Sequence, residues 1–248
     1  MLSLTGGAPK ELVEIAGVPV VIRVLEECAA SGVSSVLVVT APGKDQIIER
    51  LSPLAGTPGM PAEIEFIIQE EPRGLADAIR LGRGFSLGEP LVIALPDNLF
   101  AGSLPGVRQV VDTYAATGLN VVAVVEITAA DAARFGPTSV FPGVIEGNEF
   151  HIDRIPGKGE RGQTFDTGGA PSAFTGVGRL VFAADAFDAI DEVEASLSPG
   201  AELDDVPVMQ RLLAGERLMG RKIDGRFFDV GLVSGYEDAG TAFGGMLK

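Results

Sequence analysis

Short apolar runs alternate with amphipathic stretches from residue 19 to residue 126. The apolar runs are rich in β-branched residues, as in SSVLVVT, and such runs are typical of buried strands. The amphipathic stretches carry helix signals; for example, Pro19 lies in the first turn of one and Gly32 follows its end. Repeated strand–helix units predict a three-layer α/β fold, in which helices cover both faces of a mixed, mostly parallel sheet. The expected strands are residues 34–40, 62–69, 91–95 and 120–126, and the expected helices are residues 19–30, 44–51, 74–85 and 105–117.

After Ala133, prolines and glycines become frequent and the apolar runs between them shorten, as in FGPTSVFPGVIEGN. Because apolar residues keep recurring, this stretch predicts a small β-rich insertion rather than a flexible linker. Residues 157–169 are the best candidate for a mobile loop. Helical patterns return at residues 184–193 and 206–214, followed by a short β pair around RKIDGRFFDVG and a closing helix from about Gly235.

The composition supports a single folded domain and limits its partners. With 248 residues, of which 46% are hydrophobic and 21% charged, the chain can bury a sizeable core. Its formal net charge of -15 has the same sign as nucleic acid and anionic membranes, so we expect neither as a partner. A phosphorylated substrate must therefore meet a local cluster of cations and hydrogen-bond donors.

Two residue types occur once each, and this excludes several kinds of site. Cys28 alone cannot form an intramolecular disulfide or a cysteine metal cage, which fits a reducing compartment, and we expect a cytoplasmic protein. The single His151 rules out chemistry that needs two histidines and disfavours a Ser-His-Asp triad. The chain begins without a signal-peptide pattern, and no run reaches the ~20 apolar residues that span a bilayer.

Gln69 and Gly74 flank the turn after an expected strand, at the edge where ligands bind in open parallel sheets. The Gln69 amide offers a paired donor and acceptor that suit the polar edge of a pyrimidine. Gly74 opens the next helix and would let a base approach the backbone. Taken alone, an ordinary strand–turn–helix connection is the simpler explanation of this motif.

Two aspartates follow strands that lie far apart in the sequence. Asp97 comes directly after an apolar run, and Asp229 follows the short strand in GRFFDVG. Each carboxylate either caps a turn or holds a cation, and together they could share a Mg²⁺ ion that carries substrate phosphates. Lys10 and Lys158 lie in Gly/Pro-rich segments and could place positive charge beside phosphate, although most lysines only solvate a surface.

Taken in order along the chain, these pieces resemble the sugar-1-phosphate nucleotidylyltransferases, or sugar-nucleotide pyrophosphorylases. The resemblance covers essentially the whole chain and implies a Rossmann-like nucleotide-diphospho-sugar transferase fold with a small β-rich sugar-binding insertion. PKELVEIAG and VGRL are most similar to the UTP:glucose-1-phosphate uridylyltransferases, whereas LPDNLF also resembles the dTTP-using thymidylyltransferases. The segments that carry the resemblance are LSLTGGAPKELVEIAGVPV, IIQEEPRGLADAI, ALPDNLF, TGVGRLVF, ELDDVPVMQRLL and GRFFDVG.

The resemblance implies a reaction and a role for each candidate residue. A hexose 1-phosphate such as glucose 1-phosphate attacks the α-phosphate of UTP or dTTP, and pyrophosphate leaves, with Mg²⁺ as cofactor. Within one domain over residues 1–248, residues 1–130 would form the nucleotide-binding half and residues 131–248 the sugar-phosphate-binding half. By family motif, Lys10, Asp97 and Lys158 are catalytic, Gln69 and Gly74 bind the nucleotide, Gly136, Gly178 and Glu202 bind the sugar, and Asp97 and Asp229 hold the metal.

The start of the chain departs from the family pattern. Family members begin with a buried strand and a Gly-x-Gly-Thr-Arg loop that binds nucleotide phosphates, whereas residues 1–5 resemble the stretch just after that loop. We therefore expect an in-frame extension upstream of Met1, and we expect the chain that starts at Met1 to be poorly folded or inactive alone. Lys158 also stands in Ile-Pro-Gly-Lys-Gly, where the family has Glu-Lys-Pro.

Two alternatives to an active pyrophosphorylase remain. One is a non-catalytic relative that kept a nucleotide or sugar-phosphate pocket, although a binding module has no need of two metal carboxylates. The other is an enzyme of the same fold that uses another nucleotide or an alcohol-phosphate acceptor. The bases of UTP and dTTP differ by one methyl group, which pocket shape discriminates by only ~1–3 kcal/mol. Family members are often dimers or tetramers, so the resemblance leaves a homo-dimer or homo-tetramer open, and the sequence identifies no contact face.

Overall fold

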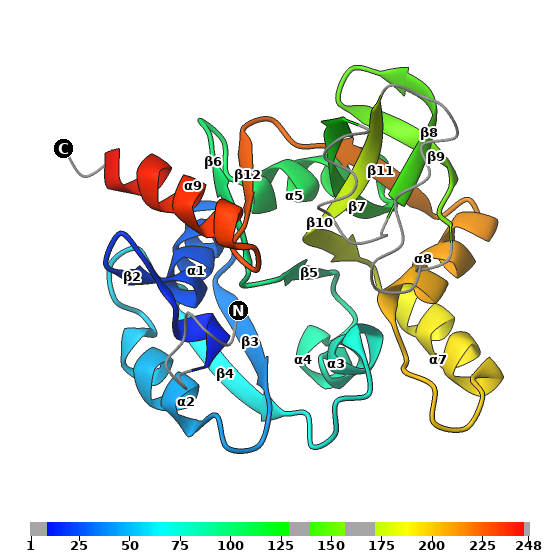
Figure 1. Cartoon of the computed structure of the whole chain (residues 1–248). Helices are drawn as coiled ribbons and strands as arrows, with labels where there is room; N and C mark the ends of the chain where they lie inside the picture. The colour runs from blue at the N-terminus through cyan, green and yellow to red at the C-terminus, as the bar shows by residue number, and fades with distance from the viewer. Residues whose placement is uncertain (1–8, 129–138, 157–171, 246–248) are drawn as a thin grey trace. The chain divides into compact units, whose positions relative to one another are not determined.

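The computed structural model describes residues 9–128, 139–156 and 172–245 (Figure 1). The chain forms two compact units that interleave along the sequence. The first unit comprises Met1–Pro72, Ala94–Arg108 and Asp224–Lys248, and the second comprises Arg73–Ile93 and Gln109–Ile223. The functional division at about residue 130, which the resemblance implies, stays a prediction.

Among its described residues, the first unit contains one parallel strand pair, two antiparallel strand pairs and the helices that pack with them. Its elements are η1 (Lys10–Leu12), β1 (Glu14–Ile15), β2 (Val18–Pro19), α1 (Val20–Ala30), β3 (Ser35–Thr40), α2 (Asp45–Leu51), η2 (Ser52–Leu54), β4 (Glu63–Ile68), β6 (Asn98–Ala101), β12 (Arg226–Asp229) and α9 (Val233–Gly245). β3 and β4 run parallel, and alternate residues such as Val36, Val38 and Phe66 pack against buried side chains of α1 and α2. This period-two pattern is the one that buries one face of a strand.

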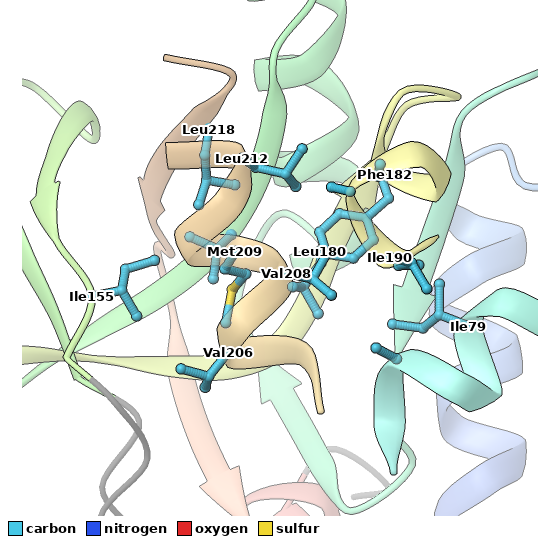
Figure 2. Packing of buried hydrophobic residues seen from close by; sticks show 14 of the residues in the cluster. Ile79, Ile155, Leu180, Phe182, Ile190, Val206, Val208, Met209, Leu212 and Leu218 are labelled. Carbon is cyan, nitrogen blue, oxygen red and sulfur yellow. The ribbon is translucent and has the colours of Figure 1, made fainter. Parts of the chain in front are cut away.

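The second unit contains a six-stranded sheet and the larger apolar core. Its elements are α3 (Leu75–Leu81), α4 (Arg83–Ser86), β7 (Asn120–Thr128), β8 (Ser139–Glu146), β9 (Glu149–Arg154), β10 (Ser172–Phe182), α7 (Ala186–Ser196), α8 (Asp205–Ala214) and β11 (Leu218–Lys222), while β5 (Leu91–Ala94) and α5 (Gly106–Thr117) begin in one unit and end in the other. Figure 2 shows Val208, Met209 and Leu212 of α8 packed among Leu180 of β10 and Ile190 of α7. None of the helices in the described ranges has the length and apolar character needed to cross a membrane.

The six-stranded sheet is mixed. Its strand order is β5-β10-β7-β11-β9-β8, and β8 pairs with β10 as well as with β9. β7 runs parallel to β11 and antiparallel to β10, and β9 runs antiparallel to both β8 and β11. The predicted α/β fold class with a mixed sheet is confirmed, and strands β8, β9 and β10 confirm the β-rich character predicted after residue 133. The mobile loop predicted at residues 157–169 lies outside the described residues.

Several local expectations need correction. The β pair expected around RKIDGRFFDVG does not pair with itself, because β11 joins the second unit's sheet and β12 pairs with β6 in the first unit. The chain turns sharply between them at Gly225, whose φ is +121°. The helix expected at residues 74–85 breaks at Gly82 into α3 and α4. β6 and the short β1–β2 hairpin were not predicted.

A buried asparagine joins three strand ends of the second unit. Asn120 is 1% exposed; its Oδ1 accepts from the Ala183 amide at 2.8 Å, and its Nδ2 donates to the Arg217 carbonyl at 2.9 Å and to Asp185 Oδ1 at 3.3 Å. Asn120→Ala is expected to lower the free energy of unfolding by about 2–3 kcal/mol, because the partly buried Ala183 amide and the Arg217 carbonyl both lose their hydrogen-bond partner. Urea denaturation checks this, and an unchanged midpoint would show that water replaces the side chain.

Candidate functional site

The first unit brings Asp97 and Asp229 onto neighbouring strands. β12 pairs antiparallel with β6 so that Asp229 lies opposite Asn98, the residue after Asp97. The Val230 amide then donates to the Asp97 carbonyl at 2.9 Å, which extends this ladder by one bond. Because backbone hydrogen bonds fix the two residues relative to each other, their carboxylates occupy one region of this unit.

Lys10 lies beside the same two carboxylates. Its Nζ donates to Asp97 Oδ2 at 2.8 Å, and the two side chains are 47% and 26% exposed. Burial alone would lower the pKa of Lys10, but attraction to Asp97 and the hydrogen bond to it outweigh burial and raise the pKa above its ordinary value. An ion pair this exposed contributes only ~0–1 kcal/mol to folding, so the cluster is a weak contributor to stability.

The pKa of Asp229 is raised above its ordinary value. Burial raises the pKa of Asp229 most. The Gly231 amide lowers it by donating to Oδ1 at 2.9 Å, and the nearby Asp97 carboxylate raises it further. Lys10 also lowers the value, but the net shift is upward from 3.8. Two carboxylates that repel each other and lie beside a single ammonium group can accommodate one more positive charge.

The pKa of Asp229 predicts a pH dependence of stability. The folded chain binds the proton of Asp229 more tightly than the unfolded chain does, so protonation of Asp229 stabilises the fold. This stabilisation is fully present below pH 3.8 and is lost as the pH rises through the folded pKa of Asp229. The asparagine in Asp229→Asn cannot ionise, so the free energy of unfolding of this variant should fall less than that of wild type as the pH rises from 3.8 through the folded pKa of Asp229. Urea titrations across this window measure the difference, and parallel curves would contradict the prediction.

The donor set fits a divalent cation that brings ligands of its own. No group of three or more His, Cys, Asp or Glu side chains that could hold a metal occurs among the described residues. Asp97 and Asp229 supply two carboxylates, and an octahedral ion such as Mg²⁺ takes its remaining oxygens from water and substrate phosphates. The cluster is therefore suited to a metal that arrives with a phosphorylated ligand.

Gln69 directly follows β4 in the first unit. The backbone amide of Gln69 donates to the Thr40 carbonyl at 2.8 Å, and this bond continues the parallel β3–β4 ladder by one residue. The side chain is partly exposed at the carboxyl end of the strand. This is the position that the sequence predicted, and its role in binding a pyrimidine stays a prediction.

In the second unit, Gly74 and Glu202 lie close together although they are far apart in the sequence. The Leu203 carbonyl accepts from the amides of Ala76 and Asp77 at 3.0 and 3.3 Å, and so caps the N-terminus of α3. A Cβ on Gly74 would lie 2.4 Å from that carbonyl oxygen, and the φ of Gly74 is +110°. Packing therefore requires glycine at this position, and the same contact places the exposed Glu202 beside the start of α3.

The remaining predicted residues are divided between β10 and undescribed segments. Gly178 has a φ of +56° and lies where the β10–β7 register shifts. The neighbouring Arg179 is 0% exposed and donates Nη1 to the Gly178 carbonyl at 2.9 Å. Sequence reasoning missed this buried arginine, since a single Arg in an apolar strand gives no distinct signal. Gly136 and Lys158 lie outside the described residues.

A second ion pair of η1 was also missed. Glu11 Oε1 accepts from Lys44 Nζ at 2.9 Å, next to the Lys10–Asp97 pair. η1 contains no buried residue. The two ion pairs therefore contribute to the position of Lys10, together with Leu12, which is partly buried against the core of the first unit.

Comparisons with known proteins agree with this architecture. The sequence profile of the family described as Nucleotidyl transferase matches residues 1–243. UTP–glucose-1-phosphate uridylyltransferase of Bacillus subtilis strain 168 is 25% identical over 257 residues, covering 95% of this chain and 83% of that protein. UDP-glucose pyrophosphorylase complexed with UDP-glucose superposes with a TM-score of 0.78 at 21% identity, over 95% of this chain and 90% of the other. The UTP-bound UGPase from Acinetobacter baumannii gives a TM-score of 0.77 at 20% identity, over 97% and 87%. These structural likenesses confirm the predicted fold.

Proposed function

The chain belongs to the nucleotidyl transferase family, and on this premise we propose that it transfers the uridylyl group of UTP to glucose 1-phosphate, giving UDP-glucose and pyrophosphate. The similar proteins named as UTP–glucose-1-phosphate uridylyltransferase or UDP-glucose pyrophosphorylase support this choice of substrates. The observation that carries the proposal is the cluster of Lys10, Asp97 and Asp229 in the first unit.

The proposed chemistry needs charge neutralisation more than proton transfer. The phosphate of glucose 1-phosphate is already ionised at neutral pH, so it can attack the α-phosphate without a general base. Lys10, whose pKa is raised, stays protonated and would donate to phosphate oxygens as negative charge develops. Asp97 and Asp229 would hold Mg²⁺, which supplies positive charge against the phosphates of both substrates.

The other proposed roles follow the family resemblance residue by residue. Gln69 would bind the polar edge of uracil, and Gly74 would let the base approach its backbone. Glu202 would accept hydrogen bonds from sugar hydroxyls, while Gly136 and Gly178 would border the sugar. Lys158 would contact the sugar phosphate. A cytoplasmic location and a homo-dimer or homo-tetramer also stay predictions.

Pyrophosphate release across a panel of nucleotides and sugar phosphates tests the proposal. We expect the highest kcat/KM with UTP and glucose 1-phosphate in the presence of Mg²⁺. Faster release with dTTP, or with an acceptor other than glucose 1-phosphate, would reassign the specificity. Absence of release with every pair, from the chain with and without in-frame upstream sequence, would favour the non-catalytic alternative.

A further inference from the structure

α9 makes an unusually close contact with the backbone of Asp229. Gly235 is the third residue of α9, and a Cβ added to it would lie 2.0 Å from the Asp229 carbonyl oxygen and 2.7 Å from its carbonyl carbon. Real Cβ atoms essentially never approach a neighbour closer than 3.0 Å. The first turn of α9 can therefore lie against Asp229 only because residue 235 has no side chain.

Other contacts hold the same stretch of backbone. The Leu232 amide donates to the Asp229 carbonyl at 3.1 Å, and the Gly231 amide donates to Asp229 Oδ1 at 2.9 Å. The Tyr236 hydroxyl, one residue after Gly235, donates to the Glu14 carbonyl at 3.1 Å and anchors the first turn of α9. Figure 1 shows α9 beside β12, the strand that ends at Asp229.

The other glycines of α9 do not share this property. Gly240, Gly244 and Gly245 have nothing within 4 Å of an added Cβ. Glycine destabilises a helix relative to alanine, and among the described residues no close neighbour of these three requires glycine there. At Gly235 the close approach to Asp229 provides that reason.

We infer that Gly235 is a positioning residue for Asp229: the missing side chain lets α9 fix where the carboxylate lies relative to Asp97. This inference rests on the proposed function, in which both carboxylates hold the metal. A methyl group at residue 235 must move α9 or Asp229 by about 1 Å, the difference between 2.0 Å and 3.0 Å. A misplacement of about 1 Å at a reacting centre can lower a rate by about 10²-fold.

Gly235→Ala and the matched control Gly240→Ala, in the same helix, test the inference. For Gly235→Ala we expect kcat to fall by about 10²-fold. The Mg²⁺ concentration for half-maximal activity should rise by about 10- to 100-fold. The KM for the sugar phosphate should not change. Gly240→Ala should keep wild-type kinetics and denature at a higher urea concentration. Because Mg²⁺ that binds only the folded chain also favours folding, the Mg²⁺ requirement is compared in samples whose urea curves show them to be folded, and there it separates positioning from simple unfolding.

A double-mutant cycle with Asp229→Ala completes the experiment. If Gly235 acts through Asp229, adding Gly235→Ala to Asp229→Ala should lower kcat no further. Additive losses, or an unchanged Mg²⁺ requirement in Gly235→Ala, would overturn the inference while Asp229→Ala still supports the proposed metal role. Full activity of Asp229→Ala would instead contradict that metal role. Gly235→Ala is also made with Gly240→Ala and Gly244→Ala to stabilise α9, and failure to fold in both forms would assign the contact to folding alone.

Discussion

Replacing Asp97 with asparagine is expected to lower kcat for pyrophosphate release by about 10²- to 10³-fold, the usual cost of losing one preorganised electrostatic group. The substitution keeps the shape of the side chain but removes the charge that Lys10 faces at 2.8 Å and that would hold Mg²⁺. Folding should change by less than about 1 kcal/mol, because the ion pair is partly exposed. The bond from the Val230 amide uses the backbone carbonyl of Asp97, so it is retained.

Steady-state kinetics with urea denaturation of the same samples separates these effects. Asp238→Asn is the matched control, since Asp238 is an exposed aspartate of the same unit, in α9. It should leave both kcat and the urea midpoint unchanged. If Asp97→Asn and Asp238→Asn have equal activity, the Lys10–Asp97–Asp229 cluster has no part in the reaction.

The elements that were predictable are those whose signal is local. β3 and α1 follow directly from an apolar run and an amphipathic stretch, and their observed bounds lie within one residue of the expected ones. The partners of β11 and β12 were not predictable in this way, because strand pairing depends on residues far away in the sequence. β6 was missed because it begins only after the turn at Leu95, Pro96 and Asp97.

The residues of the candidate site also differ in whether the local sequence signals them. Asp97 and Asp229 stand out because a carboxylate directly after an apolar strand needs a partner, and the structure brings both beside Lys10. The roles of Glu11 and Gly235 depend on atoms that approach only in three dimensions: a lysine 33 positions along the chain and the carbonyl of Asp229. Nothing in their local sequence distinguishes such contacts from ordinary surface residues.

Gly74→Ala is expected to cost the second unit about 3–5 kcal/mol, which combines backbone strain with overpacking. With φ +110° and ψ 172°, Gly74 occupies a region that is essentially restricted to glycine. The new Cβ would also lie 2.4 Å from the Leu203 carbonyl oxygen. Relieving that overlap breaks the bonds from Ala76 and Asp77 that cap α3, so most of the loss should appear as a lower urea midpoint.

Gly84→Ala is the control for Gly74→Ala, because it adds the same methyl group in α4 with nothing within 4 Å. It should leave the urea midpoint unchanged or raise it slightly.

Kinetics on the folded fraction of Gly74→Ala then separate two roles of Gly74. Because Leu203 must move, the neighbouring Glu202 moves with it, and a rise confined to the KM for the sugar phosphate would indicate packing alone. A rise in the KM for UTP as well would support direct contact between Gly74 and the nucleotide, and unchanged stability would show that α3 is not capped by Leu203.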